Sequence, residues 1–134
     1  MNNNYRVWNK EESCWVDEVF LTPNGDVISL EPHRWKSDVY KTDLKPDSKF
    51  IVQHSINITD KNNKIIYEGD VVQTEFDVIG VVLYVPDKLS FILIDFENDR
   101  FYYLTELRCK QCEIIGNVLE NPKLIPKYNG NIKT

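Results

Sequence analysis

Cys109 and Cys112 have the C-x-x-C spacing found in zinc sites and in thiol redox motifs. A structural zinc site needs four ligands, usually two such pairs or one pair and two histidines. The other candidates, Cys14, His33 and His54, are scattered without ligand spacing. A thioredoxin-like role would place the motif at the start of a helix after a strand, and no βαβ pattern is present. We therefore expect ordinary thiols, with no metal and no cofactor.

Glu68 and Asp70 flank Gly69 and form the most prominent carboxylate pair. A cation such as Ca²⁺ requires six or more oxygen ligands from a spaced loop, and the neighbouring sequence does not supply them. Gly69 suits a tight turn, and Asp70 suits backbone hydrogen bonds that hold such a turn. His54 is predicted on the apolar face of a strand. Without a nucleophile elbow or a Gly-rich phosphate loop, we do not expect an enzyme.

The chain is rich in aromatic residues, at 12% of the sequence, and strand alternation must turn some of them outward. Adjacent residues on a strand point to opposite faces, so at least one residue of the pair Tyr102 and Tyr103 is a candidate contact. Exposed aromatic side chains often mark protein interfaces. The candidate interaction residues are Trp8, Trp35, Tyr84, Tyr102 and Tyr103.

The formal net charge of −5 argues against a non-specific nucleic-acid binder, which needs clustered cations to neutralise phosphates. Acidic residues are concentrated between residues 68 and 106, and basic residues between 34 and 49. Nucleic-acid binding would require the cations of the first half to converge on one face. These cations are Arg6, Arg34, Lys36, Lys41 and Lys45.

Strand patterns dominate the chain. In the C-terminal half, five short β-branched or aromatic runs, joined by tight turns, begin at Val71, Val78, Leu89, Phe101 and Glu113. The link 105–111 is long enough for one helical turn. The N-terminal half shows strand patterns at 5–8, 15–20, 27–30 and 50–58, an Asn24-Gly25 hairpin turn, and an ambiguous segment at 31–46 that fits a short helix.

These patterns predict a mostly β protein with an SH3-like five-stranded small barrel in the C-terminal half. A β-rich N-terminal extension would pack on it. The expected division is residues 1–60 for the N-terminal region, 61–122 for the barrel and 123–134 for a tail. No window approaches the roughly 18 apolar residues of a membrane helix, and no secretory signal is recognisable. An odd cysteine count fits a reducing compartment, so we expect a cytoplasmic protein.

Three stretches resemble the YopX family of phage and prophage proteins. They are the aromatic-Arg-x-Trp start at Tyr5, the Ile-Tyr-Glu-Gly-Asp hallmark ending at Asp70, and the Ile-Gly-Asn and Glu-Asn-Pro ending at Pro122. Asn63 stands where a turn glycine is usual and Asn57 where a Thr-Gly is usual, and Asn tolerates left-handed φ. The resemblance implies an SH3-like barrel but no established activity. The motif residues are Tyr67, Glu68, Gly69, Asp70, Gly116, Asn117, Asn121 and Pro122.

Two classes of function follow as hypotheses. The leading one is a phage-encoded accessory protein that binds a host or phage protein in the bacterial cytoplasm, through barrel-surface aromatic and acidic residues. Self-association into a homo-oligomer is a further expectation for a small barrel with aromatic-rich edges. The alternative is a nucleic-acid or nucleotide binder that stacks bases on aromatic residues. An enzyme is the least favoured class, and no membrane partner is expected.

Overall fold

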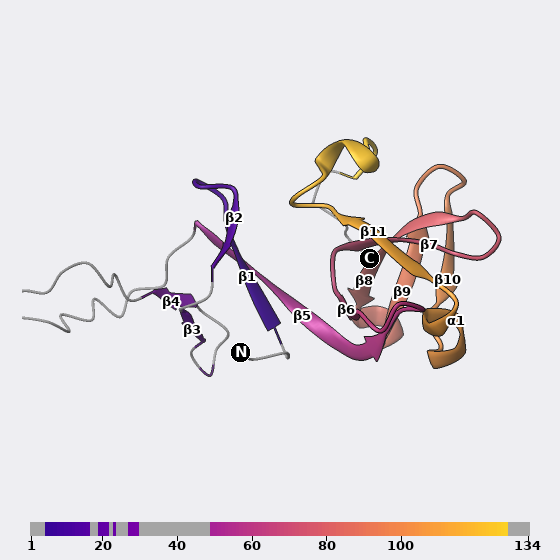
Figure 1. Cartoon of the computed structure of the whole chain (residues 1–134), viewed down its shortest axis with the longest axis horizontal. Coiled ribbons are helices and arrows are strands. Elements are labelled where there is room, and N and C mark those ends of the chain that lie inside the picture. The colour runs from indigo at the N-terminus through magenta and orange to yellow at the C-terminus, as the bar shows by residue number, and fades with distance from the viewer. Residues whose placement is uncertain (1–4, 17–18, 22, 24–26, 30–48, 129–134) are drawn as a thin grey trace, which may run out of the picture. The chain divides into compact units, whose positions relative to one another are not determined.

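The structure is a computed structural model that describes residues 5–16, 19–21, 23, 27–29 and 49–128 (Figure 1). It divides into two compact units, which hold residues 6–52 and 53–134. The expected short helix at 31–46 lies outside the described residues, as do Trp35 and His33. The mostly β fold predicted from the sequence is confirmed, since the described residues form eleven strands and only short helices.

The first unit contains two small antiparallel arrangements. Strand β1 (Tyr5–Asn9) pairs with β2 (Cys14–Val16), and β3 (Val19–Leu21) pairs with β4 (Val27–Ser29). The predicted Asn24-Gly25 turn lies outside the described residues. The run expected as one extended segment at 15–20 is therefore two strands. The long strand β5 (Phe50–Thr59) begins in this unit and continues into the second.

The second unit is built on a five-stranded antiparallel sheet that forms a half-barrel, with the strand order β10-β9-β8-β7-β11. Its strands follow the five predicted runs closely, and a short helix fills the 105–111 link. In chain order, the elements after β5 are β6 (Ile65–Tyr67), β7 (Asp70–Gln73), β8 (Ile79–Val85), η1 (Pro86–Lys88), β9 (Ser90–Asp95), β10 (Arg100–Tyr103), α1 (Glu106–Lys110), β11 (Glu113–Asn117) and η2 (Pro122–Leu124). Strand β6 pairs with β5.

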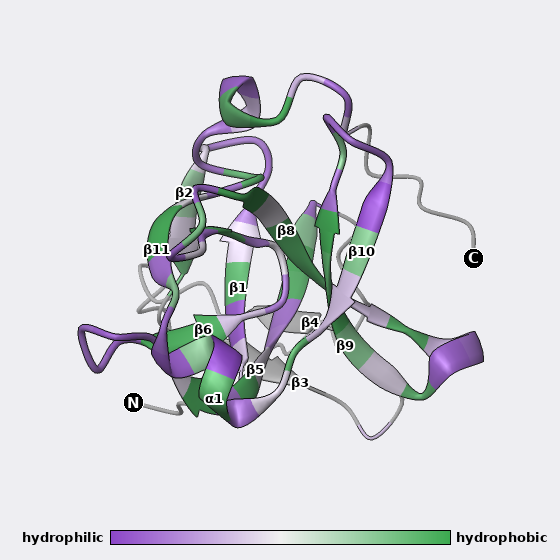
Figure 2. Ribbon diagram, turned by 90° about the vertical axis from the view of Figure 1, so that its right-hand side faces the viewer, coloured by the Kyte–Doolittle hydropathy of each residue, from purple (hydrophilic) through white to green (hydrophobic). Residues whose placement is uncertain are grey.

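Both faces of this sheet are apolar, which is why β8 and β9 are hydrophobic along most of their length (Figure 2). On one face Val82 and Leu93 pack with Ile66 and both C-x-x-C cysteines. On the other face Val81 packs against residues of the C-terminal segment 118–128, including Val118, Ile125 and Tyr128. The sheet is thus covered by separate apolar clusters on its two sides.

Strand β5 departs from the predicted alternation. Gln53 and Ser55 are buried and His54 is exposed, so the placement of His54 on the apolar face was wrong. The β5–β6 register shifts between Ser55 and Thr59, with Asn57 at φ 62° in this bulge. Between these two pairs β5 advances by four residues and β6 by two, so regular alternation is interrupted, and the adjacent residues Ser55 and Ile56 are both buried. The predicted left-handed conformation of Asn57 and Asn63 (φ 63°) is present.

Candidate interaction surface

Three polar side chains meet in the interior of the second unit. Asn117 donates through Nδ2 to Gln53 Oε1 and to Asp70 Oδ1, each at 2.9 Å. All three residues are almost completely buried. Among the described residues, every buried side-chain nitrogen and oxygen has a hydrogen-bond partner. The amide of Asn117 therefore joins β11 to both β5 and β7 without leaving an unsatisfied group.

The turn between β6 and β7 holds the central motif. Asp70 Oδ2 accepts the backbone N–H of Tyr67 at 2.8 Å, the kind of contact expected from the sequence. Gly69 has φ 90°, which an L side chain adopts only with strain, and a Cβ there would lie 2.2 Å from Gln53 Nε2. Its carbonyl accepts the N–H of Val118 at 3.0 Å. The central and terminal motifs, far apart in sequence, are hydrogen-bonded to each other.

The terminal motif closes a turn after β11. Asn117 donates its backbone N–H to Asn121 Oδ1 at 3.1 Å, and Asn121 N–H donates to the Asn117 carbonyl at 2.7 Å. A Cβ on Gly116 would lie 2.5 Å from Leu124 Cδ1, so the following chain packs directly on the glycine. Pro122 begins η2. The sequence motif is therefore a compact turn, and its polar groups bond within the fold.

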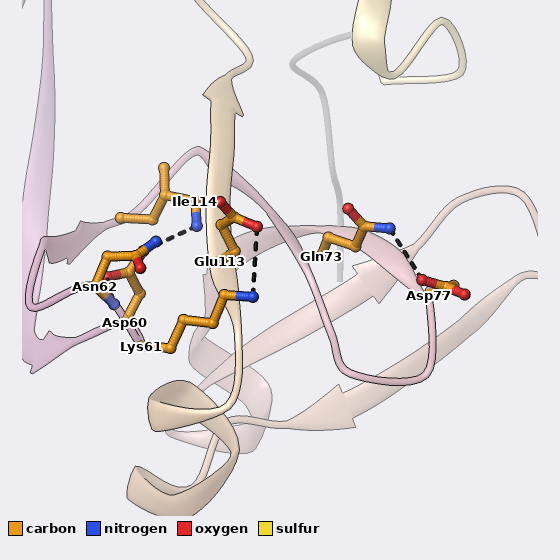
Figure 3. A network of polar contacts seen from close by, with 7 residues as sticks. All are labelled: Asp60, Lys61, Asn62, Gln73, Asp77, Glu113 and Ile114. Carbon is orange, nitrogen blue, oxygen red and sulfur yellow. Dashed lines mark hydrogen bonds and ion pairs between the residues drawn. The ribbon is translucent and has the colours of Figure 1, made fainter.

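A second polar anchor lies at Asp60 (Figure 3). Asp60 Oδ1 accepts the backbone N–H groups of Asn62 and Lys64, and Oδ2 accepts that of Ile114 at 3.0 Å. Lys61 forms an ion pair with Glu113 at 3.5 Å over the same strand. The buried carboxylate thus fixes the β5–β6 turn and ties it to β11.

The C-x-x-C cysteines are buried in the core. Burial raises the pKa of the Cys109 thiol from 9.0 to about 11, and the neighbouring Cys112 adds to this shift. Burial also raises the pKa of Cys112, whose Sγ lies 3.0 Å from the Arg108 carbonyl. Reactive cysteines have lowered pKa values and some exposure. Among the described residues, no group of three or more His, Cys, Asp or Glu side chains is placed to hold a metal ion.

Strand β10 carries the exposed aromatic residues of the sheet. Phe101 is 46% exposed and Tyr103 50%, and their rings meet edge to face at 5.7 Å. Tyr102, between them, points to the opposite face and packs on the core. Tyr103 is the exposed member of the predicted pair. The i, i+2 spacing of Phe101 and Tyr103 was visible in the sequence, but Phe101 was not singled out there.

Cations surround the same strand. Lys88 Nζ lies 4.5 Å from the ring centroid of Phe101. Arg108 donates through Nη1 to the Tyr103 carbonyl at 3.0 Å, and its guanidinium lies over the Tyr102 ring. Arg100 is exposed at the first position of β10. Within the described part of the chain, no carboxylate lies at ion-pair distance from any of these three cations.

The remaining predicted contact residues differ in exposure. Trp8 is 8% exposed and packs edge to face on Trp15 at 4.9 Å, an arrangement that argues against an interaction role. Tyr84 is 40% exposed and packs against Phe91 at the rim of the core. Of the five cations considered for nucleic-acid binding, only Arg6 is described, and its guanidinium lies 4.2 Å from the Trp15 ring centroid. The β10 surface, defined here as Phe101, Tyr103, Lys88, Arg100 and Arg108, is the candidate site.

The fold and its motifs define a small β protein of the YopX type, and comparison with known proteins supports this class. The model of the YopX protein family matches residues 4–126, so the chain belongs to this family. The crystal structure of protein YopX from Bacillus subtilis is similar, with TM-score 0.55 and 21% identity over 92% of this chain and 98% of that one.

Another similar structure is protein EF1440 from Enterococcus faecalis, with TM-score 0.47 and 22% identity over 91% of this chain and 96% of that chain. No match was found among curated proteins. In the described part of the chain, no helix has the length and apolar character needed to cross a bilayer.

Proposed function

We propose that this YopX-family chain is a phage-encoded accessory protein that binds a host or phage protein in the bacterial cytoplasm and does not catalyse a reaction. The observation that carries the proposal is the pair of half-exposed aromatic residues, Phe101 and Tyr103, on β10. Large aromatic side chains that remain in water are a typical feature of interface cores and of binding hot spots.

The internal bonding of the family motifs supports the same proposal. Glu68 and Asp70 lie in a turn in which Asp70 bonds the backbone of Tyr67 and the amide of Asn117. A catalytic carboxylate needs access to a substrate, whereas Asp70 is buried and hydrogen-bonded to other groups of this chain. The motif residues therefore stabilise the fold, and we expect the functional site on its surface.

The test is affinity purification of the full chain from infected host cells, with and without nuclease. We expect a protein that is retained after nuclease treatment and lost when Phe101→Ala and Tyr103→Ala are combined. Phe76→Ala is the matched control, because Phe76 is 81% exposed and lies outside the β10 surface. Recovery of no protein that depends on the β10 surface would contradict the proposal.

A second candidate is nucleic-acid binding, favoured by one observation. Lys88 and Arg108 lie beside aromatic rings, and neither they nor Arg100 have ion-pair partners among the described residues, an arrangement also used to bind single strands. In this case the captured partner would disappear with nuclease, and the protein would be retained on a polyanion column until the salt concentration was raised.

A further inference from the structure

The outer edge of β10 leaves backbone groups without strand partners. Leu104 donates its N–H to the Phe91 carbonyl at 3.3 Å, which sets the phase of the β9–β10 ladder. In an antiparallel ladder, residues that bond the neighbour alternate with residues whose N–H and C=O point away. The backbone N–H and C=O groups of Arg100 and Tyr102 therefore point toward β9. Those of Phe101 and Tyr103 point away from it, toward the outer side of the sheet.

Other contacts agree with this phase. The Tyr103 carbonyl accepts a hydrogen bond from Arg108 Nη1, which requires that this carbonyl face away from β9. Strand β10 is the last strand of its sheet, and among the described residues no other strand is hydrogen-bonded on its outer side. Figure 2 shows β10 beside β9 at the border of the sheet. An extended peptide added here would meet outward groups of two alternate residues.

We propose that this edge accepts an extended acidic segment of a partner protein as an added β-strand. The inference rests on the proposed function and specifies its partner. In strand addition, main-chain hydrogen bonds give affinity, and alternate side chains give specificity. The rings of Phe101 and Tyr103 lie on one face of the sheet that the added strand would extend. Arg100 and Arg108 lie on the opposite face, together with Tyr102.

Charge selects the partner. Three cations without ion-pair partners among the described residues lie along this edge of a chain with net charge −5. An isolated surface cation gains little by itself, but complementary charge steers association and sets register. The segment that fits alternates apolar residues, which meet the two exposed rings, with acidic residues, which meet Arg100 and Arg108. Lys88, beside the Phe101 ring, would attract a further acid on the apolar face.

Ring geometry favours a peptide over a nucleic acid. Bases stack face to face on free aromatic surfaces. Phe101 and Tyr103 are nearly perpendicular to each other, at 85°, so they do not form parallel platforms. Lys88 Nζ already lies against the Phe101 ring. The outward backbone groups are also more useful to an extended peptide, which can pair with them along its length.

The first test uses a capped synthetic peptide of about six residues, a usual strand length, with alternating valine and glutamate. Titration of the isotope-labelled full chain by NMR should shift the Phe101 and Tyr103 amide signals and slow their hydrogen exchange. The matched control peptide carries lysine in place of glutamate and should bind at least about tenfold more weakly because it meets like charges.

Two substitutions at one position separate the ring from the backbone. Tyr103→Ala removes the ring and keeps the N–H, whereas Tyr103→Pro removes both. Proline is tolerated on an edge strand where the N–H faces outward. We expect Tyr103→Pro to bind the acidic peptide about tenfold more weakly than Tyr103→Ala, the effect of one lost hydrogen bond of about 1 kcal/mol or slightly more. Thermal unfolding checks that both variants fold.

A further variant avoids proline. Combined Lys88→Gln and Arg100→Gln keeps the backbone and the rings, and should weaken binding of the acidic peptide while reducing its salt dependence. Equal affinity of the acidic and lysine peptides, or equal loss in Tyr103→Ala and Tyr103→Pro together with full binding by the glutamine variant, would overturn the proposal.

Other occupants give different results, each of which overturns the proposal. If a short oligothymidine shifts the same signals and the acidic peptide does not, the edge binds nucleic acid. If sedimentation shows a dimer that Tyr103→Pro abolishes, and the peptide does not compete, the edge pairs with a second copy. If purification from infected cells recovers the same nuclease-resistant protein with Tyr103→Pro, the proposed function stands and the strand-addition site does not.

Discussion

The interior around Asn117 and the outer edge of β10 both contain hydrogen-bond donors and acceptors. Those in the interior bond within the fold, whereas those at the edge are directed outward. Around Asn117, the amide oxygen of Gln53 and a carboxylate oxygen of Asp70 accept from one amide at 2.9 Å, away from water. At β10, the outward groups of Phe101 and Tyr103 meet only the Arg108 side chain among the described residues, beside two half-exposed rings. Groups that bond within the fold stabilise it, whereas groups directed outward are available to a partner. Substitutions in the first region should therefore lower the free energy of unfolding. Substitutions in the second should weaken the affinity for a partner.

The largest stability effect should come from Asn117→Ala. It removes a buried donor that bonds both the amide oxygen of Gln53 and the carboxylate of Asp70, at a cost of about 3 kcal/mol in the free energy of unfolding. Chemical denaturation measures the loss, and Asn62→Ala, at an exposed position, should change stability by less than about 0.5 kcal/mol. Equal effects of the two changes would contradict the structural role of the network.

Asp60→Ala should have the next largest effect. The buried carboxylate accepts three backbone N–H groups, one of them on β11, so its loss should cost about 2 to 3 kcal/mol. The loss should appear in denaturant melts and as faster hydrogen exchange at the Ile114 amide. Glu75→Ala is the comparison, because Glu75 is an exposed acid, is not at positive φ and has no side-chain hydrogen bond among the described residues.

Gly69→Ala should cost about 1 to 2 kcal/mol, through positive φ and displacement of the Gln53 amide. Combining it with Gln53→Ala separates the two causes, because the small side chain removes the collision and leaves only the backbone strain. If the two changes are additive in a double-mutant cycle, the close approach of Gly69 and Gln53 contributes nothing to the stability cost of Gly69→Ala.

The pKa of Cys109 predicts a smaller, pH-dependent effect. Because folding raises this pKa from 9.0 to about 11, the folded state holds the proton more tightly, so the contribution to stability is complete below pH 9 and is lost as pH rises toward 11. The loss should be about 1 kcal/mol over the first pH unit above 9. It is measured as the difference between the parent chain and Cys109→Ala across that range; a constant difference would contradict it.

The smallest stability effects should come from the β10 surface. Phe101→Thr and Tyr103→Thr replace half-exposed rings with a residue suited to strands, so each should change the free energy of unfolding by less than about 1 kcal/mol. The same variants should lose the protein partner in purification from infected cells. A cost as large as that of Asn117→Ala would mean that β10 is a structural region and would remove the contrast with the interior.

Most of the second unit could be predicted from local pattern. The β-branched and aromatic runs matched β7 to β11 closely, because their turns were marked by proline, glycine and charged residues. The failure at β5 also has a local cause. Alternation placed His54 on the apolar face, but the irregular pairing around Asn57 interrupts that alternation, so Gln53 and Ser55 are buried instead and Gln53 bonds Asn117. Alternation within one strand does not reveal a partner supplied by another.

The amino-acid sequence by itself determined the strand content, the turn positions and the family, since these depend on side-chain type at short range and on motifs within one segment. Only the tertiary structure decided that the Gly69 and Asn117 motifs bond each other, and that the Phe101 and Tyr103 rings and the edge of β10 remain open. The physical reason is that burial and hydrogen-bond satisfaction depend on which distant strands become neighbours. An exposed tyrosine and a core tyrosine, such as Tyr103 and Tyr102, are identical in sequence until the sheet assigns each a face.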